Sequence, residues 1–373
     1  MTQRLKTPVA NPISRIRQDI QSMHAYAVQD SAGMTKLDAM ENPHRLPAAL
    51  QAHLGQRLGA LALNRYPNDR VNDLRKALAD YAQMPEGFDI MLGNGSDELI
   101  SLLAMACDVP GEAGGGRPPA AILSPLPGFV MYAMSAQLQG LKFIGVPLTP
   151  DFELDEAAML AAIAEHQPSI TYLAYPNNPT ANLWDDAAIE NIIEAVGLQG
   201  GLVVMDEAYQ PFASKSYINR IAKHSHVLLM RTMSKFGLAG VRLGYMMGPK
   251  ALIAEIDKVR PPYNISVLNY ECALFALEHQ DVFSAQALDL IGQRAMLLEA
   301  LANMPGVKCW KSDANMILIR VADSGKTFDG MKAQGVLVKN VSKMHALLAN
   351  CLRLTVGTAD ENLLMLAALK TSL

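Results

Sequence analysis

Lys235 stands in a setting that suits covalent chemistry on a carbonyl group. It follows Thr232-Met233-Ser234 and precedes a glycine-rich stretch, Phe236–Gly244, which contains Arg242 seven positions further on. An amine must lose its proton before it attacks a carbonyl, and burial or a nearby cation lowers its pKa enough for that. This pattern suits a Schiff base beside an anion site. The alternative is a solvated surface lysine, because most lysines in proteins are exposed to solvent.

Asp206 ends the wholly apolar run Leu202–Met205, so its carboxylate is expected at the carboxyl edge of a sheet. A half-buried carboxylate needs a cationic partner, and a protonated pyridine nitrogen is such a partner. The alternative is an aspartate that caps the next helix. Tyr209, three positions on, could contact a phenolate oxygen or could be a core aromatic.

Two further segments could hold a ligand. Gly93–Glu98 leads into a helix, where Ser96 and Asp97 would offer backbone amides and the positive end of the helix dipole to a phosphate. The same residues also fit a simple capping motif. Asn178 could donate to a phenolate oxygen, although a turn residue beside Pro179 would look the same.

The elements that position these residues follow a regular pattern. Short runs rich in Val, Ile and Leu alternate with helical stretches such as Glu98–Asp108 and Asp185–Val196. This pattern predicts an α/β fold with a mostly parallel sheet covered by helices on both faces, in which ligands bind at the carboxyl ends of the strands. The predicted strands include Ala120–Leu123, Ile170–Ala174, Leu202–Met205 and Val227–Met230.

A second, smaller α+β domain is predicted after a break at Arg260–Pro262. We expect an N-terminal arm over residues 1–45 that joins the small domain, a large domain over 46–260 and a small domain over 261–373. The expected elements of the small domain are helices Asn269–Glu278 and Ala285–Leu301, then strands Met316–Val321, Val336–Lys339 and Cys351–Val356.

Composition excludes several classes of protein. The net charge of −4 gives no sign of a nucleic-acid partner. No apolar run reaches the ~18 residues of a membrane helix, and residues 1–22 lack the apolar core of a secretory signal. The four cysteines form no CxxC pair and read as reduced thiols, so a cytoplasmic location is expected. His224 and His226 lack a third ligand, so no metal is expected.

The order and spacing of the motifs form a stronger signal than any of them alone. Asn178 and Asp206 are 28 positions apart, and Asp206 and Lys235 are 29 apart, about one βαβ unit in each case. From about Leu37 to Thr358 the chain resembles the fold-type I pyridoxal-phosphate aminotransferases. Within that superfamily it resembles the histidinol-phosphate aminotransferases, through the stretches 37–43, 65–67, 176–180, 231–235, 237–244 and 351–358.

The resemblance implies a role for each site residue. Lys235 would hold pyridoxal 5′-phosphate covalently, Asp206 would pair with its ring nitrogen, and Asn178 and Tyr209 would contact its ring oxygen. Phe129 would stack on the ring, while the phosphate would lie among Ser96, Asp97, Thr232, Ser234 and Arg242. Tyr66 would reach the cofactor of a neighbouring subunit, which implies a homodimer. Arg353 would bind the anionic end of the substrates, with Tyr26 and Asn42 lining the same pocket.

Two positions depart from the family pattern. Ala181 replaces the usual glycine after Asn178-Pro179-Thr180, which predicts a slightly reshaped turn. Lys339 stands where the family often has a second arginine that binds the substrate. We expect Lys339 to bind the substrate in its place, as a point charge that cannot form two parallel hydrogen bonds to one anion.

The implied reaction is transamination of L-histidinol phosphate with 2-oxoglutarate, which gives imidazole-acetol phosphate and L-glutamate in histidine biosynthesis. An aminotransferase for aromatic or other amino acids and a threonine-phosphate decarboxylase-like enzyme stay open, because one arginine accepts either a carboxylate or a phosphate. A more remote alternative is an aminotransferase-like transcription regulator. Only about forty residues precede the motifs, too few for a helix-turn-helix domain.

Overall fold

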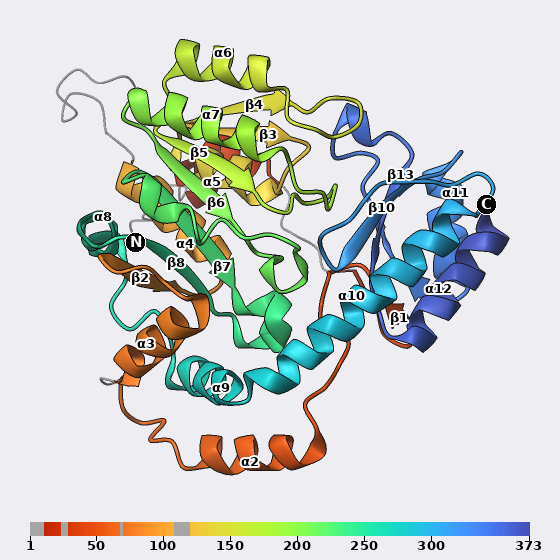
Figure 1. Cartoon of the computed structure of the whole chain (residues 1–373), viewed down its shortest axis with the longest axis horizontal. Coiled ribbons are helices and arrows are strands. Elements are labelled where there is room, and N and C mark those ends of the chain that lie inside the picture. Colours follow the sequence, from red (N-terminus) through yellow and green to blue (C-terminus); the bar gives the residue numbers. More distant parts are fainter. Residues whose placement is uncertain (1–10, 24–28, 68–69, 108–119) are drawn as a thin grey trace, which may run out of the picture. The chain divides into compact units, whose positions relative to one another are not determined.

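The computed structural model describes residues 11–23, 29–67, 70–107 and 120–373 (Figure 1). The chain divides into two compact units, residues 1–32 and 33–373. In the first unit a 3-10 helix, Pro12–Arg15, precedes the single-turn helix α1 (Gln18–Gln21). Asn11 caps the 3-10 helix by accepting from the Ile13 amide at 3.1 Å. None of the side chains in these two helices is buried.

The second unit contains a seven-stranded sheet with the strand order β2-β8-β7-β6-β5-β3-β4. Only β8 runs antiparallel to its neighbours, so six of the seven strands are parallel. The predicted α/β class with a mostly parallel sheet is therefore confirmed. The strands are β2 (Phe88–Gly93), β3 (Ala121–Leu126), β4 (Lys142–Pro147), β5 (Ile170–Ala174), β6 (Leu202–Asp206), β7 (Val227–Thr232) and β8 (Gly244–Pro249).

Helices cover both faces of this sheet, and two separate apolar cores result (Figure 1). Strand residues alternate between the cores because successive side chains point to opposite faces. In β6, Val203 and Met205 belong to the first core and Val204 to the second, so Asp206 emerges on the second face. The first core is covered by α3 (Arg70–Ala82), α6 (Glu156–His166), α7 (Asp186–Leu198) and α9 (Val267–Glu278), and the second by α4 (Ser96–Cys107), α5 (Val130–Gln139) and α8 (Lys250–Ile256).

The C-terminal part of the second unit forms an antiparallel sheet of the order β12-β13-β10-β9. A third core lies between this sheet and three helices, of which α10 begins beside α9 and extends to α12 (Figure 1). This agrees with the predicted α+β pattern. The elements are α10 (Gln280–Ala302), β9 (Lys308–Cys309), β10 (Met316–Arg320), α11 (Ser324–Ala333), β12 (Lys339–Asn340), β13 (Cys351–Thr355) and α12 (Ala359–Ser372).

The remaining elements are short or peripheral. Strand β1 (Thr35–Lys36) pairs in parallel with β11 (Val336–Leu337), and helix α2 (Ala48–Gly59) buries none of its side chains. One π-helical turn, Ser234–Leu238, follows β7 directly. Short 3-10 turns occupy Gln210–Phe212, Ile221–Lys223, Ala239–Val241, Asp257–Val259 and Ala346–Leu348.

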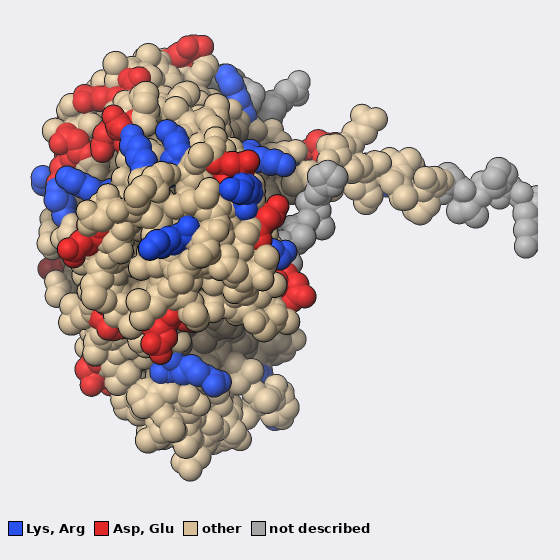
Figure 2. Space-filling view, turned by 90° about the vertical axis from the view of Figure 1, so that its right-hand side faces the viewer, with Lys and Arg blue, Asp and Glu red and all other residues tan. Residues whose placement is uncertain are grey.

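Two surface properties bear on function. Basic and acidic side chains are interspersed on the face shown in Figure 2, without a continuous basic patch. Within the described ranges, no helix combines the length and the apolar character that crossing a membrane requires.

Candidate active site

Most of the predicted cofactor residues gather around one cavity of about 130 Å³ at the carboxyl ends of β5, β6 and β7. This is where a parallel sheet is expected to bind its ligand. Every residue predicted to contact the cofactor, except Tyr66, lines it. The lining consists of Met40, Ser96, Asp97, Phe129, Tyr132, Ala174, Pro176, Asn178, Asp206, Ala208, Tyr209, Thr232, Ser234, Lys235 and Arg242.

Asp206 is a buried carboxylate at one end of the cavity, with only 4% of its surface exposed. The Tyr132 hydroxyl donates to its Oδ2 at 2.6 Å, and the Ala208 amide donates to its Oδ1 at 3.0 Å. Burial raises the pKa of Asp206 to about 6 against these two hydrogen bonds. Among the described residues no ion pair reaches it. The carboxylate is therefore suited to a cationic ligand atom.

Lys235 projects into the same cavity from the π-helical turn after β7. Its Nζ donates to the Ala39 carbonyl at 3.1 Å and lies 5.8 Å from the centre of the Tyr209 ring. Burial, together with the positive charges of Arg353 and Arg242, lowers the pKa of Lys235 to about 8. A substantial share of neutral amine is thus present near physiological pH, as a nucleophilic lysine requires.

The other end of the cavity is built for an anion. Helix α4, twelve residues long, begins at Ser96, so its first two residues, Ser96 and Asp97, line the cavity. The Arg242 guanidinium lies 3.5 Å from the Asp97 carboxylate. Gly95 has φ +84°, and a side-chain carbon there would meet Arg242 Nη2 at 2.8 Å. The positive φ favours glycine at this position, and the absence of a side chain lets the Arg242 guanidinium approach the backbone closely. The hydroxyls of Thr232 and Ser234, 3.0 Å apart, complete this end.

Arg353 of β13 in the C-terminal sheet contacts the cavity residue Asn178, although it is not itself among the residues that line the cavity. Leu352 and Leu354 on either side of it face the helices of that sheet, so Arg353 points the opposite way. Its Nη1 donates to Asn178 Oδ1 and its Nη2 to the Asp38 carbonyl, each at 2.8 Å. Lys339 is the register partner of Arg353 on β12, which places both residues on the same face of the sheet.

The turn after Asn178 keeps a left-handed backbone at Ala181 although glycine is absent. Ala181 has φ +66° and is fully buried. Its amide donates to the Asn177 carbonyl at 2.8 Å, and its own carbonyl accepts from the Asp313 amide at 2.7 Å. These two hydrogen bonds fix a conformation that an alanine rarely adopts.

Four residues predicted from the resemblance lie elsewhere or outside the description. Tyr66 is 77% exposed and stacks on Tyr263 with ring centres 4.7 Å apart, away from the cavity lining. Asn42 donates to Gln286 at 3.0 Å and, like Lys339, is not among the residues that line the cavity. Tyr26 lies outside the described residues.

Sequence reasoning assigned no site role to five lining residues, Met40, Tyr132, Ala174, Pro176 and Ala208, and two of them bear on the geometry of the site. Tyr132 stands three positions after Phe129, one helical turn on, and that spacing was a signal that both face the site. Met40 carries φ +52°, with its amide donating to Thr355 Oγ1 and its carbonyl accepting from Asn315 Nδ2. Nothing in the local sequence predicts that backbone conformation, because both partners are distant in the chain.

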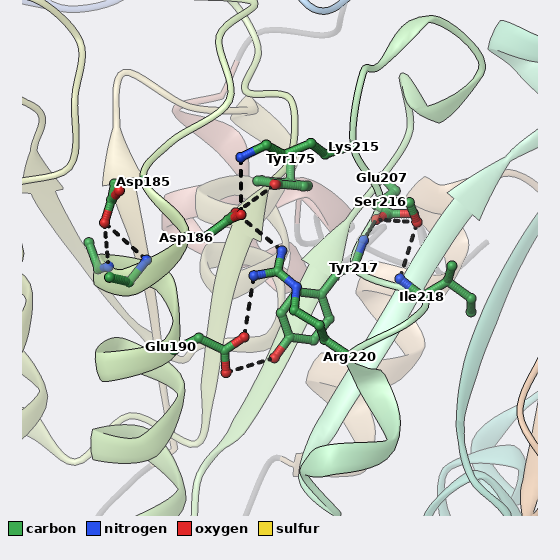
Figure 3. Close-up of polar contacts among 12 residues, drawn as sticks. Tyr175, Asp185, Asp186, Glu190, Glu207, Lys215, Ser216, Tyr217, Ile218 and Arg220 are labelled. Carbon is green, nitrogen blue, oxygen red and sulfur yellow. Dashed lines mark hydrogen bonds and ion pairs between the residues drawn. The ribbon is translucent and has the colours of Figure 1, made fainter.

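A polar network occupies the opposite face of the same strand ends, on the side of α7 (Figure 3). Glu207 accepts from Arg231 at 2.9 Å and from the Ser216 hydroxyl at 3.0 Å, and the Tyr217 amide also donates to it. Further out, Asp186 accepts from Tyr175, Lys215 and Arg220, and Glu190 accepts from Arg220. Every acid in this network has a positively charged partner.

The described residues contain no group of three or more His, Cys, Asp or Glu side chains that could hold a metal ion. His224 instead lies 3.1 Å from Glu190, and His226 lies 2.9 Å from the Ile193 carbonyl.

Comparison with known proteins agrees with this geometry. Residues 32–369 match the family Aminotransferase class I and II. The chain is 80% identical to a histidinol-phosphate aminotransferase of Polaromonas naphthalenivorans over 96% of both chains. It is 69% identical to one of Methylibium petroleiphilum over 97% of this chain and 96% of the relative. Among solved structures, histidinol-phosphate aminotransferase from Sinorhizobium meliloti in complex with pyridoxal-5′-phosphate shares the fold, with a TM-score of 0.81, 23% identity and coverage of 96% and 97% of the two chains.

Proposed function

The chain belongs to the histidinol-phosphate aminotransferase family within the class I and II aminotransferases, and from this premise we propose that it transfers the amino group of L-histidinol phosphate to 2-oxoglutarate. The products would be imidazole-acetol phosphate and L-glutamate, in histidine biosynthesis. One observation carries the proposal: a single cavity brings together an amine of lowered pKa, a buried carboxylate and an anion-binding helix end.

These residues fit pyridoxal 5′-phosphate, the cofactor of the family. When bound, it supplies an aldehyde for the substrate amine and a ring that withdraws electrons from the substrate α-carbon. Asp206 would hold the protonated ring nitrogen, since its buried carboxylate calls for a cation. The α4 amides, the hydroxyls of Thr232 and Ser234, and Arg242 would hold the phosphate. Phe129 would stack on the ring, and Asn178 and Tyr209 would contact the ring oxygen.

Lys235 would act first as a nucleophile and then as general acid and base. Its Nζ, with a pKa of about 8, can release a proton to become the attacking amine and can take one up again when it is free. The Ala39 carbonyl, 3.1 Å away, supports the amine in one orientation within the cavity. A proton removed from the substrate α-carbon would therefore travel on the Nζ of Lys235.

Arg353 would bind the anionic end of each substrate. Its guanidinium is fixed by Asn178 and the Asp38 carbonyl, so its orientation is set before a substrate arrives. A planar fork accepts a carboxylate and a phosphate equally well. Lys339, on the same face of the sheet, would add a second positive charge, and Asn42 would line the same pocket.

We also propose a homodimer in which Tyr66 reaches the partner's cofactor, and the exposure of the Tyr66 and Tyr263 rings supports this arrangement. The division into an arm (1–45), a large domain (46–260) and a small domain (261–373) is likewise a proposal. The core beneath the C-terminal sheet supports a separate small domain, and α9 (Val267–Glu278) packs in the first core, with the large sheet. The four free cysteines agree with a cytoplasmic location.

The test is a substrate comparison with coupled detection of glutamate or 2-oxoglutarate. Purified protein loaded with pyridoxal 5′-phosphate should turn over histidinol phosphate with 2-oxoglutarate, and phenylalanine much more slowly. Threonine phosphate is included to detect decarboxylation. If phenylalanine is the better substrate, or if carbon dioxide is released, the proposed substrate is wrong although the family is right.

A further inference from the structure

Tyr132 is a cavity residue that none of the roles described above uses. It lies in the first turn of α5 and has 1% of its surface exposed. Its hydroxyl donates to Asp206 Oδ2 at 2.6 Å, a short distance typical of a hydrogen bond to an ionised carboxylate. Its ring meets Phe129 edge-on, with centres 5.6 Å apart. Tyr132 therefore touches both the carboxylate and the aromatic predicted to stack on the cofactor.

The ring of Tyr132 is held from behind by Tyr172 of β5. The two rings are stacked at 4.2 Å with an interplanar angle of 7°, and both are buried. Tyr172 points to the same face of the sheet as Asp206, but its own hydroxyl has no hydrogen-bond partner among the described residues. Two neighbouring tyrosines thus share one environment, and only one of them contacts the carboxylate.

We propose that Tyr132 is a positioning residue for the cofactor, whose hydroxyl fixes the Asp206 carboxylate in the ionised form and in the orientation that pairs with the ring nitrogen. This inference rests on the proposed function, because it assumes that Asp206 holds that nitrogen. It goes further by assigning the orientation of Asp206 to one hydroxyl group.

The hydrogen bonds around Asp206 support the assignment. Oδ1 accepts from the Ala208 amide and Oδ2 from Tyr132, so each oxygen has one fixed donor and retains a lone pair for a ligand. A donor favours the charged form of a carboxylate. Tyr132 therefore opposes the burial that raises the pKa of Asp206 to about 6. The other titratable groups that act electrostatically on this carboxylate are Asp97, Tyr172 and Tyr209, together with Glu207 from the opposite face of the sheet.

The matched variants Tyr132→Phe and Tyr172→Phe test the proposal. Each removes one buried hydroxyl from the same stacked pair and leaves both rings. The measurement is equilibrium binding of pyridoxal 5′-phosphate to the apoprotein between pH 5.5 and 8.5, followed by absorbance. We expect Tyr132→Phe to weaken binding about 10- to 100-fold, the range for a lost hydrogen bond to a charged group. The pH below which binding fails should also rise. Tyr172→Phe should change binding less than about twofold.

A double-mutant cycle with Asp206→Asn separates positioning from packing. In the Asp206→Asn background the further change Tyr132→Phe should have almost no effect, because the charge that the hydroxyl stabilises is gone. Equal losses in both tyrosine variants, an unchanged pH limit, or a persistent loss in the Asp206→Asn background would overturn the proposal. A Tyr132→Phe protein that fails to fold would also count against it, since the hydroxyl is assigned to the site. Failure of the wild type to bind the cofactor would instead refute the proposed function.

Discussion

The carboxyl ends of β6 and β7 carry ionisable side chains on both faces of the sheet, and the two faces differ in how these charges are balanced. Asp206 and Glu207 are adjacent in the chain and both are buried. Glu207 faces α7, where Arg231 and two further donors satisfy it. Asp206 faces the cavity with two neutral donors, and among the described residues no ion pair reaches it.

The charges on the α7 face stabilise the fold, whereas those on the cavity face are suited to binding a ligand. A buried charge costs free energy unless a partner compensates it, and the network around Glu207 provides that partner within the chain. On the cavity face the compensation is incomplete, and the result is a raised pKa for Asp206 and a lowered one for Lys235. A bound ligand can supply the partners that these two groups lack within the chain. Perturbed pKa values cluster at functional sites for this reason.

The largest effect is expected from removing the amine on the cavity face. Lys235→Ala should lower transamination by at least about 10⁴-fold, because the residue that attacks the aldehyde and moves the proton is lost. The unfolding midpoint of the apoprotein should change little, since Lys235 makes one hydrogen bond to a backbone carbonyl. Steady-state kinetics and thermal unfolding measure the two quantities. Substantial activity in this variant would remove Lys235 from the mechanism.

On the opposite face, Glu207→Gln should destabilise the apoprotein by about 3–5 kcal/mol, because Arg231 is left buried without its counter-charge. Denaturant unfolding measures the change. Asp206→Asn is the matched control, one residue away in the chain and likewise a change from a carboxylate to an amide. Equal losses of stability in the two variants would contradict the contrast between the faces.

The control variant Asp206→Asn should instead stabilise the apoprotein at neutral pH. Burial raises the pKa of Asp206 from 3.8 to about 6, so between these pH values the native state binds more protons and stability falls as pH rises. Above about pH 6 the buried charge lowers the folding stability of the wild type by the full amount, about 3 kcal/mol, and Asp206→Asn removes this cost. A weaker hydrogen bond in the variant offsets about 1 kcal/mol of the gain in stability. Apo Asp206→Asn should therefore be about 2 kcal/mol more stable at pH 7.5.

That advantage should disappear near pH 4, because the native wild type then holds the proton and nearly half of the unfolded chains hold it too, which removes most of the cost. Unfolding of the two apoproteins at pH 4 and pH 7.5 gives the comparison. An advantage of the same size at both pH values would show that the cause is packing rather than charge.

The smallest effect is expected at the exposed edge of the network. Asp186 is paired with Lys215 and Arg220, but its side chain is 39% exposed. Asp186→Asn should therefore cost only about 0–1 kcal/mol, and the loss should shrink in high salt. Unfolding at two ionic strengths tests this. A loss as large as that of Glu207→Gln would show that burial is not what separates the two acids.

Much of the fold was predictable because the strands are short apolar runs with clear boundaries. Ile170–Ala174 was predicted with the observed bounds, and the predicted Leu202–Met205 and Val227–Met230 extend in the structure to Asp206 and Thr232. Of the added residues, Asp206 and Thr232 line the cavity, whereas Arg231 lies on the opposite face and pairs with Glu207. The antiparallel insertion of β8 between β2 and β7 was not predicted, because pairing direction is set by the path of the chain between strands.

By itself, the sequence determined which residue types stand at the strand ends, since the motifs Asn178-Pro179-Thr180, Asp206–Tyr209 and Ser234-Lys235 are local and follow apolar runs. Only the tertiary structure decided how these residues are paired. The hydrogen bond of Tyr132 to Asp206, that of Lys235 to the Ala39 carbonyl and that of Arg353 to Asn178 each join segments at least 74 residues apart. Burial and charge at a site depend on all the segments that meet there, so the pKa values of Asp206 and Lys235 follow from the assembled fold.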